Sequence, residues 1–275
     1  MKVRGVNQPI NRSATRLKLG IIYFRAKRYM FWIFGGIKFA KVSENQLEHE
    51  HFAYQTPLLR KLKDVDMFLQ NNKITNLRIA VAKLDGVILH PGETLSYWKL
   101  IGKPTRRKGY LPGMMLDKGT VKAGVGGGLC QLSNLIYWMT LHTPLTVIER
   151  HRHSYDVFPD SGRTQPFGSG ATCFYNYGDL MIRNDTAQAF RLKLDVGESH
   201  LRGAWLSSAP TKHRYEVYEK EHLIQSEYWG GYTRHNVIYR KIYDLEGTIL
   251  EDKFVAENHA IMMYAPLIAA HEERK

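Results

Sequence analysis

Cys130 is the residue whose type and position best suit chemistry, and it is one of only two cysteines in this chain. Three glycines come before it: Gly126, Gly127 and Gly128. Apolar residues after it recur at the i, i+3, i+4, i+7 spacing of a helix with one buried face, namely Leu132, Leu135, Ile136 and Met139. Because glycine disfavours helix interiors, the helix is predicted to begin near Cys130. Unpaired backbone N–H groups and the helix dipole at that end favour a thiolate, the nucleophilic form of cysteine.

Two histidines follow this predicted helix, directly after a β-branched run at residues 145–148. A strand that runs back beside the start of the helix would bring His151 or His153 to Cys130 as a general base. Alternation puts both histidines on one face, with Arg150 and Arg152 on the other, and the spacing does not choose between them. A cysteine nucleophile with a histidine base is the arrangement used for acyl transfer, although an inert buried cysteine fits the same pattern.

Backbone and side-chain donors near Cys130 complete the predicted site. The N–H group of Cys130 or Gln131, together with the Gln131 side-chain amide, would donate to the oxyanion of a tetrahedral intermediate. The glycine run would alternatively cradle an anionic group of a substrate, but it lacks the Gly-Lys-Ser/Thr ending of a nucleotide-binding loop. The predicted substrate-binding residues are Gly126, Gly127, Gly128, Ser133, Arg150, His151 and Glu93. Since the remaining histidines lack zinc-ligand spacing, we expect no metal and no cofactor.

Charge and composition restrict the partners of the chain. Its 275 residues are 44% hydrophobic, enough for a globular core, and 39 basic against 26 acidic residues give a net charge of +13. Such a balance favours an anionic partner, although a basic surface also serves solubility. Two cysteines are too few for a disulfide scaffold. Charge alone does not distinguish a membrane surface, nucleic acid and a carboxylate-rich substrate.

The N-terminal 45 residues form a basic segment rich in aromatic residues. Arg25, Lys27 and Arg28 interrupt its apolar stretch, so we expect neither an export signal nor a transmembrane helix. The predicted location is therefore cytoplasmic or peripheral at the membrane. Two interpretations stay open: the segment lies on an anionic membrane surface, or it forms a helix packed on the domain.

The elements that must position Cys130 predict an α+β fold, with the central Cys130 helix packed on a largely antiparallel sheet. A helix is predicted over residues 74–84 and a strand, Pro-Gly turn and strand over 87–98, followed by a long loop over 102–125. Strands are predicted at 174–177, 179–183, 190–196 and 201–206, then at 215–218, 236–243 and 249–255. These elements divide the chain into an N-terminal segment 1–45, a main domain 46–210 and a β-rich C-terminal appendage 211–275.

Several motifs in a fixed order closely resemble the VanW family over roughly residues 70–208. They are Pro91–Thr94, Tyr97–Trp98, Gly126–Asn134, Leu141–Thr146, Glu149–Arg150, His153 and Arg183–Thr186. The resemblance implies a cell-wall protein of the glycopeptide-resistance type, with L,D-transpeptidase-like acyl transfer on peptidoglycan stem peptides. It makes Cys130 the nucleophile and His153 the base, and places Gly170 where the family often has Asp.

The expected partner is accordingly a peptidoglycan stem peptide or precursor, with an anionic membrane surface as a further partner. Nucleic acid is not expected. The alternative function is a non-catalytic accessory module that binds an anionic cell-wall precursor or a membrane surface.

Overall fold

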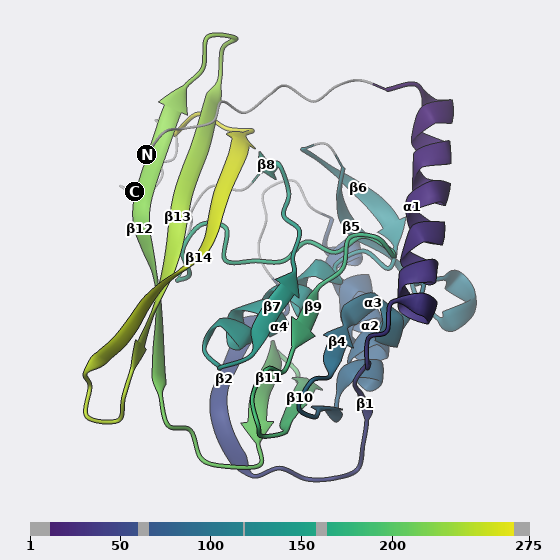
Figure 1. The fold of residues 1–275 in the computed structure, drawn as a ribbon. Helices are drawn as coiled ribbons and strands as arrows, with labels where there is room; N and C mark the ends of the chain where they lie inside the picture. The colour runs from purple at the N-terminus through teal and green to yellow at the C-terminus, as the bar shows by residue number, and fades with distance from the viewer. Residues whose placement is uncertain (1–11, 60–65, 118, 158–163, 267–275) are drawn as a thin grey trace.

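The computed structural model describes residues 12–59, 66–117, 119–157 and 164–266 (Figure 1). The α+β fold class is confirmed. The helices in these ranges are α1 (Ala14–Phe34), α2 (Met67–Leu84), α3 (Tyr97–Ile101) and α4 (Cys130–Leu141). Helix α4 begins at Cys130, and the four apolar residues that predicted it are all at most 1% exposed. The apolar periodicity therefore identified both the helix and its buried face.

A five-stranded antiparallel sheet supports the two long buried helices. Its order is β1 (Lys41–Val42), β3 (Val87–Leu89), β10 (Phe190–Val196), β11 (His200–Ser207) and β2 (His49–Pro57). Helix α2 packs on β10, and α4 packs on β11 and β2. Leu77, Ala80 and Leu84 of α2 share one core with Leu135 and Ile136 of α4. The sheet is thus the platform that holds the start of α4 in place.

A smaller sheet lies on the other side of α4 and consists of β4 (Thr94–Ser96), β9 (Met181–Arg183) and β7 (Thr146–Glu149), in that order. A separate hairpin is formed by β5 (Pro112–Asp117) and β6 (Thr120–Val125). Strand β7 ends at Glu149, immediately before the two histidines. This places the loop that follows β7 next to the smaller sheet.

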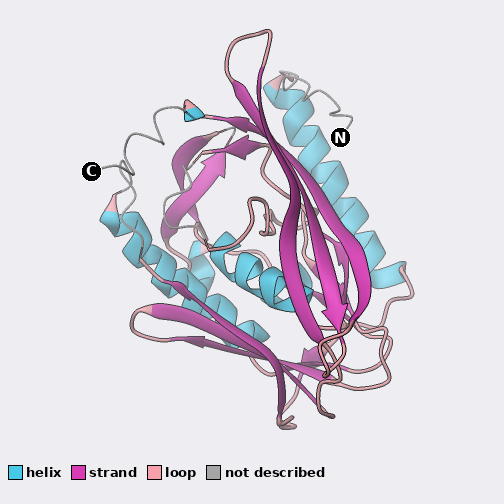
Figure 2. Cartoon of the chain, turned by 90° about the vertical axis from the view of Figure 1, so that its left-hand side faces the viewer, coloured by secondary structure: helices cyan, strands magenta, loops and turns pink. Residues whose placement is uncertain are grey.

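Long strands near the C-terminus form a fourth sheet, made of β12 (Arg214–Ser226), β13 (Tyr232–Tyr243), β14 (Ile249–Met262) and the short β8 (Tyr155–Asp156). They stand along one side of the molecule, with α1 on the opposite side (Figures 1 and 2). A turn at Glu246-Gly247 closes the last hairpin, where Asp244 N–H donates to the carbonyl of Thr248. Arg240 donates to the carbonyls of Leu141 and Thr143 and so ties the sheet to the end of α4.

Three predicted elements are wrong. Tyr97 and Trp98 begin helix α3 instead of continuing a strand, because Ser96 caps that helix by accepting from Lys99 N–H. The predicted loop over 102–125 contains the β5–β6 hairpin. Residues 174–177 form no strand but a tight turn, closed by an isolated bridge between Phe174 and Gly178. At residues 97–98 a helix cap, and at 174–177 a tight turn, override the apolar pattern.

Helix α1 packs on the main domain by one face. Ile21, Arg25, Arg28 and Trp32 are partly buried there, whereas no residue of the helix is fully buried. None of the helices in the described ranges has both the length and the apolar character that crossing a bilayer requires. The first eleven residues of the predicted N-terminal segment and residues 267–275 of the predicted appendage lie outside the described residues.

Candidate functional site

The glycine run before Cys130 is pressed against the β5–β6 hairpin and helix α2. A Cβ atom on Gly127 would lie 2.2 Å from backbone atoms of Gly113. The Gly127 carbonyl accepts from Asn76 Nδ2 at 2.9 Å, and the side chain of Asn76 also bonds the backbone of Leu111. Gly128 has a φ of 91°, where an L side chain is strained. Close packing therefore explains the glycines, and their predicted contact with substrate stays a prediction.

We expect Gly127→Ala to lower the free energy of unfolding by about 2 kcal/mol, because the added methyl group meets fixed backbone instead of a movable side chain. Chemical denaturation of both proteins measures this loss. Gly20→Ala is the matched control, since a Cβ atom there would meet no heavy atom within 4 Å. A Gly127→Ala protein as stable as the Gly20→Ala protein would contradict the packing interpretation.

The Cys130 thiol is partly buried and lies against a backbone carbonyl. Its Sγ atom is 3.8 Å from the carbonyl oxygen of Cys173, and both cysteines are free thiols. Burial raises the pKa of the Cys130 thiol, and the hydrogen bonds to Sγ do not offset it. The prediction of a thiolate at the start of the helix is therefore wrong for the resting protein. The cost of desolvating a sulfur anion exceeds what the helix terminus contributes here.

Residues 170–173 run between the start of α4 and the loop after β7. On one side, Ser133 Oγ donates to the carbonyl of Ala171 at 2.6 Å, in addition to the Cys130 contact with Cys173. On the other side, Thr172 N–H donates to the carbonyl of His151 at 2.9 Å. Residues 170–173 therefore contact the Cys130 helix on one side and the His151 loop on the other.

His151 belongs to a network of charged groups. Its Nε2 atom is 2.9 Å from Glu149 Oε1, and its ring lies 5.4 Å from the ring of Phe174. Its Nδ1 atom has no hydrogen-bond partner among the residues that the structure describes, and its side chain is 37% exposed. A carboxylate that orients one imidazole nitrogen leaves the other nitrogen available to accept a proton.

Glu149 is the centre of this network. It accepts two hydrogen bonds from the guanidinium of Arg28 in α1, at 2.6 and 2.8 Å, and one from Asp179 N–H at 3.0 Å. Burial acts to raise the pKa of Glu149, but the hydrogen bonds from His151, Arg28 and Asp179 outweigh it and hold the pKa below its ordinary value. Glu149 is therefore ionised at neutral pH, and Arg28, His151 and the Asp179 N–H group hold its carboxylate in place.

Asp179 is a residue that the sequence analysis missed. It is fully buried, and it accepts from Ser96 Oγ at 2.5 Å and from the N–H groups of Trp98 and Leu180 at 2.9 Å. Burial raises the pKa of Asp179 to about 7, against the opposing effect of the Ser96 and Trp98 hydrogen bonds. A buried carboxyl that titrates near neutrality is a common feature of functional sites. Its sequence signal was weak, because a single Asp after Gly178 is typical of any turn.

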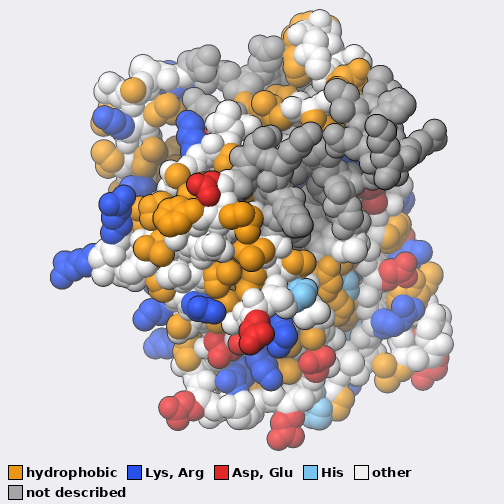
Figure 3. Space-filling view, turned by 180° about the vertical axis from the view of Figure 1, so that it is seen from behind, with side chains coloured by type: hydrophobic (Ala, Val, Ile, Leu, Met, Phe, Trp, Pro, Cys, Tyr) orange, Lys and Arg blue, Asp and Glu red, His pale blue; other side chains and the backbone are white. Residues whose placement is uncertain are grey.

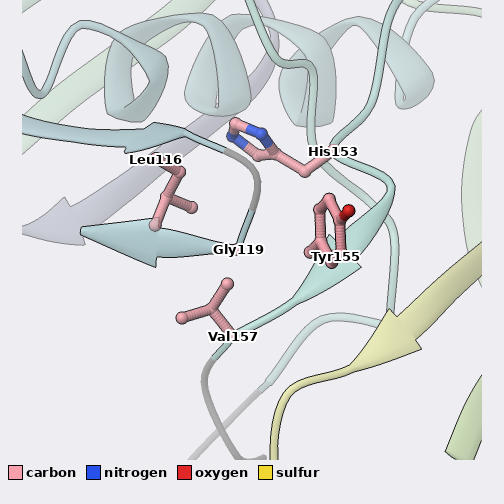
Figure 4. Close-up of a pocket in the computed structure, with 5 residues that line it drawn as sticks. All are labelled: Leu116, Gly119, His153, Tyr155 and Val157. Atoms are coloured by element: carbon pink, nitrogen blue, oxygen red, sulfur yellow. The ribbon is translucent and has the colours of Figure 1, made fainter. Parts of the chain in front are cut away.

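His153 lies apart from this network in a small hollow (Figure 4). It lines a cavity of about 20 Å³ together with Leu116, Gly119, Tyr155 and Val157. This volume accommodates about one water molecule, and no substrate group. Burial lowers the pKa of His153, with a smaller contribution from Arg152. No histidine is hydrogen-bonded to the Cys130 thiol within the described ranges, and the pairing of Cys130 with His153 stays a prediction.

The other predicted site residues have structural partners. Gln131 Nε2 donates to Thr56 Oγ1 and to the carbonyl of Pro57, at 2.9 and 2.8 Å, and Gln131 N–H donates to the Gly128 carbonyl. These bonds occupy the Gln131 donors that were predicted to stabilise an oxyanion, which leaves the N–H group of Cys130 as the predicted donor. Ser133 is completely buried. The predicted catalytic and binding roles of both residues stay untested.

Arg150 and Glu93 also serve the fold. Arg150 donates to the carbonyls of Gly168 and Gly170 and to Asn258 Oδ1. Glu93 accepts from His90 N–H and closes the turn between β3 and β4. A Cβ atom on Gly170, where the family resemblance leads one to expect Asp, would lie 2.6 Å from Asn134 Oδ1. No group of three or more His, Cys, Asp or Glu residues is arranged to hold a metal ion in the described part of the chain.

Comparison with known proteins identifies the family. The sequence model of the family described as VanW like protein matches residues 72–206, which include Cys130, Glu149, His151 and Asp179. The chain belongs to the VanW family. Its match to the Vancomycin B-type resistance protein VanW of Enterococcus faecalis is 29% identical over 232 residues, which is 84% of each chain.

A second relative matches a shorter part of the chain. The Uncharacterized protein YoaR of Bacillus subtilis is 28% identical over 131 residues, or 47% of this chain and 42% of that protein. No solved structure is significantly similar to the chain. The matched region contains Glu149, His151 and Asp179, whereas α1, which supplies Arg28, and β12 to β14 lie outside it.

Proposed function

We propose that the protein acts on the peptide part of a cell-wall precursor, by L,D-transpeptidase-like acyl transfer through Cys130. The relative named as a vancomycin resistance protein supports the cell-wall context. The observation that carries the chemistry is the contact of residues 170–173 with Cys130 on one side and with His151 of the Glu149 network on the other. This arrangement offers a thiol, a base oriented by a carboxylate, and an extended backbone between them.

In the proposed reaction, Sγ of Cys130 attacks the carbonyl carbon of a stem-peptide amide while Nδ1 of His151 accepts the thiol proton. The N–H group of Cys130 would donate to the oxyanion. When the amide C–N bond breaks, the leaving amine takes the proton from His151 and a thioester remains on Cys130. The amine of a second stem then attacks the thioester, and the thiol is regenerated. Since burial raises the pKa of Cys130, the proton leaves during attack and not beforehand.

Binding without catalysis is the second candidate function. It is favoured by the neutral resting thiol and by the lack of a hydrogen bond between Cys130 and any histidine in the described residues. In this function the same surface would hold an anionic cell-wall precursor, as a partner of enzymes that act on it.

Intact-protein mass spectrometry separates the two functions. We expect the wild-type protein, incubated with purified muropeptides and an acceptor amine, to form an acyl adduct and cross-linked product, and Cys130→Ala to form neither. His151→Asn should reduce the product at least about 100-fold, the usual contribution of a general base. His153→Asn is the matched control and should retain most of the product, because its ring lines a separate cavity.

The outcomes discriminate clearly. Loss of product in His153→Asn with retention in His151→Asn would overturn the assignment of the base and restore His153. Muropeptide binding by calorimetry that is unchanged in Cys130→Ala, with no adduct in any protein, would establish the binding function instead.

A further inference from the structure

Helix α1 carries its apolar residues on the face that points away from the protein. The face toward the domain contains Ile21 and Trp32 together with two arginines, of which Arg28 binds Glu149 and Arg25 donates to the carbonyl of Tyr175. The opposite face presents large apolar side chains that are between 57% and 68% exposed, namely Leu19, Ile22, Tyr23, Met30 and Ile33. A helix that only packs on a soluble domain carries polar residues on its outer face, so the apolar outer face of α1 needs another explanation.

The spacing of these residues makes the exposed face continuous. Positions 19, 22, 23, 26, 30 and 33 follow the i, i+3, i+4 rule along one side of the helix, so they form a stripe from its first turns to its last. Phe34, at the end of the helix, is 73% exposed. Both ribbon views place α1 at the margin of the molecule (Figures 1 and 2). An exposed apolar stripe of this length marks an interaction surface.

The charge around the stripe selects the partner. No acidic residue occurs in the sequence before Glu44, and Arg16, Lys18 and Lys27 in α1 are all exposed. The face of the molecule seen from behind in Figure 3 also carries Lys and Arg side chains along its left-hand edge, which corresponds to the right-hand side of Figure 1, where α1 lies. Apolar and aromatic side chains flanked by basic ones are typical of a helix that lies in the surface of an anionic membrane.

We propose that α1 lies in the plane of an anionic lipid bilayer, with the stripe of Leu19, Ile22, Tyr23, Met30 and Ile33 inserted among the acyl chains and its basic residues at the headgroups. The inner face of the helix stays on the protein, through the Arg28–Glu149 ion pair. The bilayer then lies one helix diameter, about 10 Å, from the Glu149 network. This inference stands independently of the chemistry proposed for Cys130.

Vesicle co-sedimentation of the full chain tests the proposal. We expect the protein to bind vesicles of phosphatidylglycerol and phosphatidylcholine (30:70), and to bind pure phosphatidylcholine at least tenfold more weakly. The double variant Ile22→Asp/Ile33→Asp should lose binding to both, because charged groups then replace the inserted side chains. Lys27→Glu should weaken binding to the anionic vesicles at least about fivefold, an effect that high salt reduces.

The matched control is Leu250→Asp/Phe254→Asp, which changes two apolar residues of β14 that are 50% and 58% exposed on the opposite side of the molecule. This variant should bind like the wild type, and equal thermal unfolding of all variants would show that they fold. Equal loss of binding in the control variant would overturn the proposal, as would equal binding to neutral vesicles. A dimer in light scattering without lipid, abolished by Ile22→Asp/Ile33→Asp, would also overturn it and assign the stripe to a second copy of the chain.

Discussion

Replacing Arg28 with alanine is expected to lower the free energy of unfolding by about 3 kcal/mol at pH 7, because it leaves the Glu149 carboxylate buried without its cation. The two side chains are only 11% and 21% exposed, and the guanidinium makes two hydrogen bonds to the carboxylate. Urea denaturation at several pH values measures the effect. The pKa of Glu149 in the folded protein lies below its ordinary value. The stabilisation is therefore complete at pH values above the ordinary pKa, and it is lost as the pH falls through the lower pKa of the folded protein.

Two further variants make the Arg28 prediction specific. Arg25→Ala removes a neighbouring arginine on the same face of α1, whose guanidinium bonds only a backbone carbonyl, and should cost much less. Arg28→Ala/Glu149→Gln removes both charges and should recover part of the lost stability. If Arg25→Ala and Arg28→Ala are equally destabilised, the cost arises from undocking of α1, and the ion pair is not its cause.

Asp179→Asn is expected to flatten the dependence of stability on pH between about pH 4 and pH 7. Asp179 binds its proton more tightly in the folded protein, where its pKa is about 7, than in the unfolded chain. The folded state therefore holds more protons in this window, and the contribution of Asp179 to stability decreases as the pH rises through it. The difference of about three pKa units corresponds to at most about 4 kcal/mol.

Asparagine keeps most of the contacts of this site, although the Ser96 hydroxyl loses its carboxylate acceptor. Its Oδ1 atom would accept from the N–H groups of Trp98 and Leu180, and its Nδ2 would donate to Ser96 Oγ. We thus expect Asp179→Asn to be more stable than the wild type at pH 8 and of similar stability at pH 4, as measured by denaturant unfolding. Asp195→Asn, at an exposed position of β10, should leave the pH profile unchanged. A wild-type profile in Asp179→Asn would assign the pH dependence to another group.

Local sequence patterns predicted the elements that depend on neighbouring residues. The spacing of Leu132, Leu135, Ile136 and Met139 gave the position and buried face of α4, and alternating residues gave β10 almost to the residue. Such patterns work because periodic burial acts within a single helix or strand. The ordered motifs around Cys130 likewise sufficed to predict the VanW family, which the match over residues 72–206 confirms.

Contacts between distant residues decided the environment of the candidate site. Arg28 and Glu149 are 121 positions apart, and Ser96 and Asp179 are 83 apart, so no local spacing indicates either pair. The chain order also gave no reason to treat His151 and His153 differently, although of the two only His151 has a carboxylate partner among the described residues.

The sequence by itself thus determined the helix that begins at Cys130, the strand–loop order that brings histidines after it, and the family. Only the tertiary structure decided the protonation state of that cysteine and the neighbours of the histidines. The physical reason is that periodicity specifies which face of an element is buried, whereas desolvation depends on everything packed against that face. For Cys130 this burial raises the pKa and outweighs the favourable position at the start of α4.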